Sequence, residues 1–368
     1  MIKSFFRLQQ VDPGFDTKNL LTMNITPLSH KFSEAQQVNV FYDQIIERVR
    51  NVPGVTSVGG VFPLPLSNSN VMETVFVEGA APVAYTDRPK VGVRSATPDY
   101  FETMGIPILK GRAIAEQDRE NTLQVIVVNQ ALANLFWPNQ DAVGKRLSFE
   151  EDSSQQVWRE IVGVVGNVKH KSLETEAQPE AYFPFHQSPS ILNLVVHTDV
   201  DPASMIPAIR SQILNVDKDQ PVSDVMTMEQ RLAKSVASRR FVMLLLGAFS
   251  VLALVLAAVG IYGVMSYLVA QRTQEIGVRM ALGAQRSDVL KLVVGKGMAL
   301  AALGTAIGLV ASLAMTRLIR SLLFEVTPTD WLTFLVGSAV LLVVGLLACY
   351  IPARRATKVD PLIALRYE

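Results

Sequence analysis

The chain has 368 residues, a mean hydropathy of +0.27 and a formal net charge of +1. Its charged fraction of 18% lies below the level of about a quarter that is usual for soluble domains, and the near-neutral balance gives no reason to expect a nucleic-acid partner. The single cysteine, Cys349, excludes a disulfide within the chain and is expected to be a small apolar filler. The four histidines are scattered, so we expect no metal site.

The first 235 residues are expected to form a mixed α/β domain. Residues 19–26 and 55–61 are strand-like, and between them apolar residues recur at three- and four-residue spacing. The same order returns with strands at 191–198 and 222–226 and a helix capped by Asp201. Two β-α-β units of this kind commonly build a ferredoxin-like sandwich, which is the fold we predict.

An insert at about 90–188 separates the two units. It contains strand-like segments at 124–130 and 159–168, with short helical segments and Gly- and Pro-marked turns between them. We therefore expect a small α/β lobe inserted into the sandwich.

Three uncharged runs follow, at 241–270, 297–316 and 331–353. About 20 apolar residues span a bilayer core of roughly 30 Å, so each run predicts a transmembrane helix. The alternative is a soluble bundle of three buried helices. The first run is longer than the bilayer requires and no helix breaker precedes it, so we predict one helix over 228–270 that leaves the membrane as a stalk.

The flanking Lys and Arg residues favour one orientation. Nine lie in the 271–296 loop and the 354–368 tail, against six near the opposite ends of the spans, although the pair Arg239 and Arg240 argues the other way. The majority places the loop and tail in the cytoplasm and residues 1–235 outside it.

No catalytic constellation is present in the sequence. The patterns GxxxxGK[ST], GxSxG, HExxH and CxxC are absent, so we expect no enzyme and no cofactor, with any ATP hydrolysis on a separate subunit. Small residues point instead to helix packing. The glycines concerned are Gly260 and Gly263 in the first span and Gly304 and Gly308 in the second, which could face another helix of the chain or a partner subunit.

The loop QRTQEIGVRMALGAQRSDV, residues 271–289, has a helical pattern of its own. Glu275 and Arg279 can pair at i,i+4, Gly283 suits a helix stop, and Ser287 could cap the next helix. The apolar side is expected to comprise Ile276, Met280 and, less regularly, Leu282. Two interpretations remain open on these residues alone: a helix lying on lipid headgroups, or a helix docked by a partner.

These segments resemble a known family. QRTQEIGVRMALGA and IPARRATKVDPLIALRYE are similar to the signature and closing motif of FtsX/MacB-type ABC transporter permeases, and VDPGF, TPDYFETMGIPILKGR and VVNQALANLFWP look like parts of the MacB-like periplasmic core. The subtype resembled is the duplicated orphan permease of acidobacterial type. Members have a membrane helix before the outer domain, and the chain, which starts at MIKSFFRLQQVDPGF, looks as if it lacks that helix.

The resemblance implies a permease subunit that transmits the motion of a separate ATPase to a MacB-like periplasmic core domain over 1–235, for export or efflux. It implies a bacterial inner membrane location and, as partners, the ATPase, a second permease copy or half, a periplasmic adaptor and membrane lipid. The alternative is an FtsX-like scaffold that regulates a periplasmic partner without transport. The coupling contact would comprise Glu275, Ile276, Arg279, Met280, Ala281, Leu282 and Gly283.

Overall fold

The computed structural model describes residues 11–28, 34–67, 69–80, 88–150, 156–173, 175–189, 191–272, 275–276, 278–279, 282, 285–319 and 331–356. The chain divides into two units, Met1–Phe241 and Val242–Glu368, which we call the α/β unit and the helical unit.

The α/β unit is built on four antiparallel strands in the order β12-β1-β11-β2. These strands are β1 (Leu20–Ile25), β2 (Val55–Phe62), β11 (Leu192–Thr198) and β12 (Val222–Thr227). Helix α2 (Ala35–Arg50) connects the first two, while the short helix η2 (Pro202–Met205) and helix α5 (Ile206–Val216) connect the last two. Numbered along the chain, the order is 4-1-3-2, so the predicted ferredoxin-like sandwich is confirmed.

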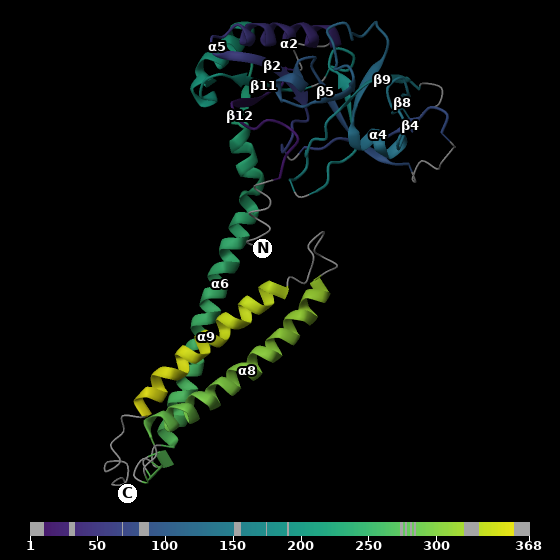
Figure 1. The fold of residues 1–368 in the computed structure, drawn as a ribbon. Coiled ribbons are helices and arrows are strands. Elements are labelled where there is room, and N and C mark those ends of the chain that lie inside the picture. Colours follow the sequence, from purple (N-terminus) through teal and green to yellow (C-terminus); the bar gives the residue numbers. More distant parts are fainter. Residues whose placement is uncertain are drawn as a thin grey trace. The chain divides into compact units, whose positions relative to one another are not determined.

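Helices α2 and α5 pack together on one face of this sheet (Figure 1). The apolar spacing of α2 explains its position, because Phe41, Tyr42 and Ile45 all point into one buried cluster with strand residues of β1 and β11. The Tyr42 hydroxyl donates a hydrogen bond to the Ile25 carbonyl (2.5 Å) and accepts one from the Leu192 amide (3.0 Å). These bonds join the helix to both strands. Asp201 caps η2 as predicted, accepting from the Ala203 amide.

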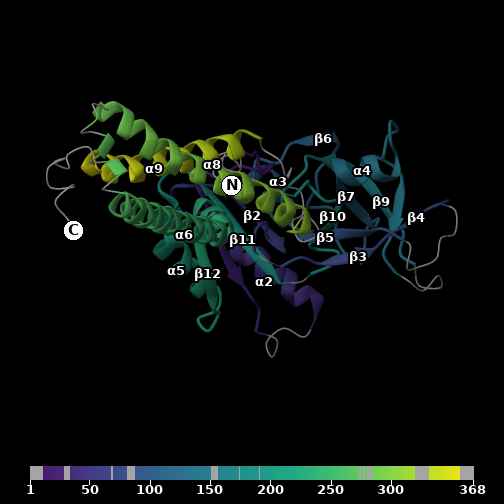
Figure 2. The ribbon, with the colours of Figure 1, turned by 90° about the horizontal axis from the view of Figure 1, so that it is seen from below.

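The inserted lobe continues the same sheet instead of forming a separate one. From β2 the order runs β5-β10-β7-β9-β8-β4, with β3 paired to β5 and β6 to β9 (Figure 2). Two short strands upstream of residue 90 belong to this lobe, so it begins earlier than the sequence indicates. The elements are β3 (Met72–Thr74), β4 (Phe76–Val77), β5 (Lys90–Ala96), α3 (Tyr100–Thr103), β6 (Ile108–Gly111), β7 (Val125–Asn129), α4 (Gln130–Phe136), β8 (Arg146–Ser148), β9 (Arg159–Val165) and β10 (Glu180–Pro184).

Helix α6 (Met228–Gln271) begins inside the α/β unit. Its first turn is fixed by a reciprocal capping box, in which the Thr227 hydroxyl accepts from the Gln230 amide and the Gln230 side chain accepts from the Thr227 amide. Met228 is fully buried in the core of the unit. Arg231 is 4% exposed, and its Nη2 donates to Asp224 Oδ2 at 2.7 Å and to Thr22 Oγ1 at 3.2 Å. The start of α6 is therefore part of the α/β core.

The helical unit contains the rest of α6, α8 (Arg286–Ile319) and α9 (Trp331–Ala356). Within the residues the structure describes, three segments are long and apolar enough to cross a membrane: Leu244–Gln271, Ser287–Ala314 and Leu335–Arg355. A soluble bundle buries its apolar side chains, but large side chains such as Leu244, Leu256 and Val310 are more than 60% exposed here. The exposure is unlike that of a soluble bundle and agrees with helices surrounded by lipid.

Close packing of α8 against α9 depends on two glycines. A Cβ added at Gly297 would lie within 2.4 Å of the Cys349 sulfur, and one at Gly345 would lie 3.2 Å from the Ala301 Cβ. We expect Gly297→Ala to destabilise the helical unit by about 1–3 kcal/mol through overpacking, and to increase maleimide labelling of the buried Cys349. Gly304→Ala is the matched control, because a Cβ there meets nothing within 4 Å. Equal labelling of both variants would contradict the packing described.

Candidate coupling site

The candidate site lies between the end of α6 and the start of α8. The described residues of this segment are 275–276, 278–279, 282 and 285, which we call the coupling segment. The Ile276 amide donates to the Arg272 carbonyl (3.0 Å), and the Leu282 amide donates to the Val278 carbonyl (3.0 Å). Both bonds span four residues, so the predicted helical character is present here. Met280, Ala281 and Gly283, also assigned to the contact, lie outside the described residues.

The predicted i,i+4 ion pair is present. Arg279 Nη2 lies 2.6 Å from Glu275 Oε1, and Arg272 Nη1 lies 4.0 Å from Glu275 Oε2. All three side chains are about half exposed, so water screens the charges and each pair contributes only about 0.3–0.5 kcal/mol. The pair orients the helix surface without contributing much stability.

The predicted apolar side divides into two faces. Ile276 is 5% exposed and packs with Met265 of α6, Val289 and Val293 of α8, and Cys349 and Ala353 of α9. Leu282 is 83% exposed. The two residues are six positions apart, about one and two-thirds helical turns, so they cannot share a face. Ile276 holds the segment to its own bundle, and the assignment of these residues to a contact with the ATPase stays a prediction.

The sequence pattern did not reveal the neighbours that hold Ile276, because they come from three separate helices. The expectation for Cys349 is confirmed, since its side chain is fully buried in this cluster. Leu282, and to a lesser extent Val278 at 41% exposed, are the apolar side chains that the described part of the segment presents to the outside.

The start of α8 differs from the prediction. Ser287 was expected to cap the helix, but α8 already begins at Arg286. The Asp288 carboxylate accepts from the Gln285 amide at 3.2 Å, and the Asp288 amide donates to the Gln285 carbonyl at 2.9 Å. The Asp288 side chain in the first turn thus accepts the hydrogen bond of the Gln285 amide, which has no partner within the helix. Ser287 lies inside the first turn and does not cap it.

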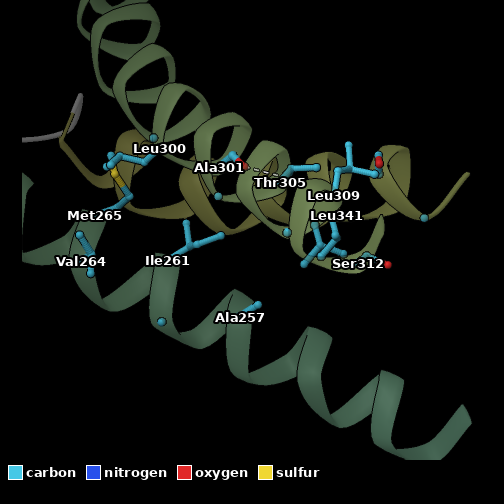
Figure 3. A pocket seen from close by; sticks show the side chains of 17 residues that line it. Ala257, Ile261, Val264, Met265, Leu300, Ala301, Thr305, Leu309, Ser312 and Leu341 are labelled. Carbon is cyan, nitrogen blue, oxygen red and sulfur yellow. Dashed lines mark hydrogen bonds between the residues drawn. The ribbon is translucent and has the colours of Figure 1, made fainter. Parts of the chain in front are cut away.

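The four glycines assigned to helix packing do not pack in the described bundle. A Cβ added at Gly260, Gly263, Gly304 or Gly308 meets nothing within 4 Å. Three of them instead line a mostly apolar groove of about 800 Å³ between α6, α8 and α9 (Figure 3). Ala257 and Ile261 of α6 lie on one side of the groove, Thr305 and Leu309 of α8 on another. In the helical unit the close approaches occur at Gly297 and Gly345, so among the described residues the predicted stripe packs against no other helix.

Comparison with known proteins agrees with this arrangement. The family model of the MacB-like periplasmic core domain matches residues 7–216, and the model of the FtsX-like permease C-terminal matches residues 247–361. The chain belongs to the MacB/FtsX family of ABC transporter permeases. Together with the three apolar helices, this makes it a membrane protein.

Some relatives of the permease are named as permeases alone, and others as combined ATP-binding and permease proteins. The chain is 27% identical over 308 residues to the uncharacterized ABC transporter permease YvrN of Bacillus subtilis, covering 79% of this chain and 74% of that protein. It is 26% identical to the macrolide export ATP-binding/permease protein MacB of Wolinella succinogenes, covering 74% of this chain but 43% of that protein. The permease thus spans less than half of MacB.

One solved structure aligns with part of the chain. The periplasmic region of MacB from Actinobacillus actinomycetemcomitans aligns with 61% of this chain and 95% of its own, with 14% identity and a TM-score of 0.39.

The α/β unit of the permease also contains a buried charged cluster. Arg94 of β5 and Glu180 of β10 are each 1% exposed, with Arg94 Nη2 at 3.0 Å from Glu180 Oε1. The Tyr182 hydroxyl donates to the other carboxylate oxygen at 2.9 Å. His170 Nε2 lies 3.2 Å from that oxygen without hydrogen-bond geometry. Sequence patterns gave no sign of this cluster, since its members are far apart in the chain.

Burial raises the pKa of Glu180 to about 7, against the opposing effects of Arg94 and the Tyr182 hydroxyl. Burial, with the Arg94 charge, lowers the pKa of His170 well below its usual value of 6.5. The pH-dependent part of the stability that Glu180 contributes through its raised pKa is therefore fully present below about pH 4.5 and is lost as the pH rises through about 7. The contribution of His170 has the opposite sign, since it is present above pH 6.5 and lost as the pH falls.

We expect Glu180→Gln, which imitates the protonated carboxyl, to isolate the Glu180 effect. The unfolding free energy of the native permease, measured relative to this variant by urea titration, should decrease between pH 5 and pH 8. A relative stability that rises over this interval would contradict the assignment.

Proposed function

We propose that the chain is the permease subunit of an ABC system for export or efflux, which transmits the motion of a separate ATPase to its α/β unit. The observation that best supports the proposal is the continuity of α6. Its first turn is buried and hydrogen-bonded in the α/β core, and its last turns join the cluster that holds Ile276 of the coupling segment. At 44 residues the helix is about 66 Å long, about twice the thickness of a bilayer core.

In this proposal the coupling segment is the place where the ATPase acts. Leu282 supplies an exposed apolar contact, while the Glu275–Arg279 pair fixes the orientation of the segment. Met280, Ala281 and Gly283 complete the contact. Displacement of the segment would move α6, α8 and α9 together, because Ile276 packs on all three. The permease itself would bind no nucleotide or other cofactor, and ATP would be held by the partner subunit.

We further propose a location in the bacterial inner membrane, with the α/β unit outside the cytoplasm and the coupling segment inside. The excess of Lys and Arg in the 271–296 loop and 354–368 tail supports this orientation. A second permease copy or half would complete the transporter, and the α/β unit would meet a periplasmic adaptor. The name of the MacB relative mentions macrolide export, which supports export as the process without assigning a substrate here.

The orientation can be measured by cysteine labelling, because the natural Cys349 is buried. We expect Lys145→Cys, at an exposed position of the α/β unit, to react with a membrane-impermeant maleimide on intact spheroplasts. Leu282→Cys should react only after the membrane is permeabilised. The reverse pattern would place the coupling segment out of reach of a cytoplasmic ATPase and would contradict the proposal.

A second assay separates the proposal from the scaffold alternative. The permease, reconstituted with its ATPase in proteoliposomes, should support ATP-dependent movement of a substrate. ATPase stimulation by a periplasmic partner in the absence of any transported compound would favour the scaffold.

A further inference from the structure

A second, smaller groove lies beside the coupling segment. It has a volume of about 70 Å³ and is formed by the last turns of the α6 span, the coupling segment and the first turns of α8. Its floor is apolar and includes Met265, Leu268 and Leu292. The volume is far below the roughly 300–1,000 Å³ typical of sites for drug-sized ligands, so it suits a single small group.

The rim of this groove is cationic. Among its described lining residues, Arg272, Arg279 and Lys296 are basic and Glu275 is acidic. Glu275 is already engaged by Arg279 at 2.6 Å and approached by Arg272 at 4.0 Å. The groove therefore carries an excess of positive charge that a single anionic group would complement.

The position of these charges in the sequence sets their depth in the membrane. Arg272 is the first charged residue after the uncharged run 241–270, and Lys296 directly precedes the run 297–316. Arg272 directly follows the apolar segment Leu244–Gln271, and Lys296 lies in the first turns of Ser287–Ala314, near the same face of the membrane. Long basic side chains at this depth extend to the headgroup layer, where they reach lipid phosphates. Leu268 lies one turn before Arg272, on the hydrocarbon side of it.

We propose that this groove binds the headgroup of an anionic phospholipid, with the phosphate held by Arg272 and Lys296 and an acyl chain lying outside the groove, along Leu268 and the apolar end of α6. The phosphate is the small anionic group that the groove itself would hold, and the apolar surface of α6 matches the chain. A bound lipid would link the end of α6 to the start of α8 and support the coupling segment between them. This binding does not require the ATPase, so it can be tested apart from the proposed function.

The test uses the full chain in detergent and native mass spectrometry to measure binding of dioleoylphosphatidylglycerol and dioleoylphosphatidylcholine. We expect the anionic lipid to bind about tenfold more tightly than the zwitterionic one. The variant Arg272→Gln/Lys296→Gln should weaken binding of the anionic lipid about 30-fold, from the usual contribution of a basic residue near an anionic lipid surface. Lys291→Gln is the matched control, because Lys291 is exposed on α8 but does not line the groove.

In each variant, Cys349 should stay unreactive toward maleimide, which verifies that the helical unit remains packed. Retention of lipid preference in Lys291→Gln and its loss in the double variant would support the proposal. Equal binding of the two lipids would overturn it, as would an equal loss in Lys291→Gln. Displacement of the lipid by millimolar inorganic phosphate would also overturn it, because the site would then recognise a free anion without the chain.

Discussion

Replacing Glu180 by Leu is expected to lower the unfolding free energy of the α/β unit by about 3–5 kcal/mol at pH 8. The substitution would leave the Arg94 guanidinium, 1% exposed, without its carboxylate. Its remaining acceptors are the carbonyls of Val71 and Val93 and the side chain of Asn70. The Tyr182 hydroxyl would lose its acceptor as well. Urea unfolding of the detergent-solubilised permease, followed by tryptophan fluorescence, measures the change.

Two variants show whether the loss comes from an unpaired buried charge. Glu116→Leu removes the carboxylate of an exposed pair with Arg119 and should change stability by less than about 0.5 kcal/mol. The double variant Arg94→Met/Glu180→Leu should regain most of the stability, because replacing both charges by apolar groups removes the desolvation cost. A double variant no more stable than Glu180→Leu would show that the cluster acts through packing alone.

Replacing Leu282 by Glu is expected to weaken functional coupling to the ATPase by about tenfold or more. Leu282 is 83% exposed, so the fold should tolerate the change within about 0.5 kcal/mol, whereas a central apolar contact commonly contributes more than about 1.4 kcal/mol to an interface. The measurement is the ATPase concentration needed for half-maximal permease-dependent ATP hydrolysis in proteoliposomes. We expect this concentration to rise while thermal stability stays unchanged.

Two further variants serve as controls. The first is Val200→Glu, which introduces the same charge at an exposed apolar residue of the α/β unit, outside the membrane spans, and should leave coupling unchanged. Ile276→Ala should lower both coupling and the stability of the helical unit, since Ile276 is buried in the bundle. Wild-type coupling in Leu282→Glu would contradict the assigned contact.

Local patterns predicted the two β-α-β units and the three spans, because helix and strand periodicities and uncharged length are properties of short segments. They did not predict that the insert extends the same sheet through the β2–β5 pairing. Nor did they assign β3 and β4 to it. Such pairings join residues far apart in the chain, and strands as short as Phe76–Val77 carry no periodicity.

The site was predicted less completely than the fold. The Glu275–Arg279 pair follows from a spacing of four residues, but the burial of Ile276 depends on side chains from α6, α8 and α9. The stripe at Gly304 and Gly308 shows that small residues indicate where a helix permits close approach, not which surface approaches it. Arg94 was missed because one basic residue within a strand looks the same whether it faces water or a buried carboxylate.

The most direct test of the account is site-specific cross-linking from position 282. A benzophenone attached to Leu282→Cys, with the buried Cys349 unreactive, should form a covalent product with the ATPase subunit in native membranes. The yield should change between the nucleotide-free and ATP-bound states, and the same probe at Lys145→Cys should give no such product. A probe at position 282 that reaches only lipid, or that reacts from the same side of the membrane as position 145, would contradict the proposal that this segment couples the permease to ATP hydrolysis.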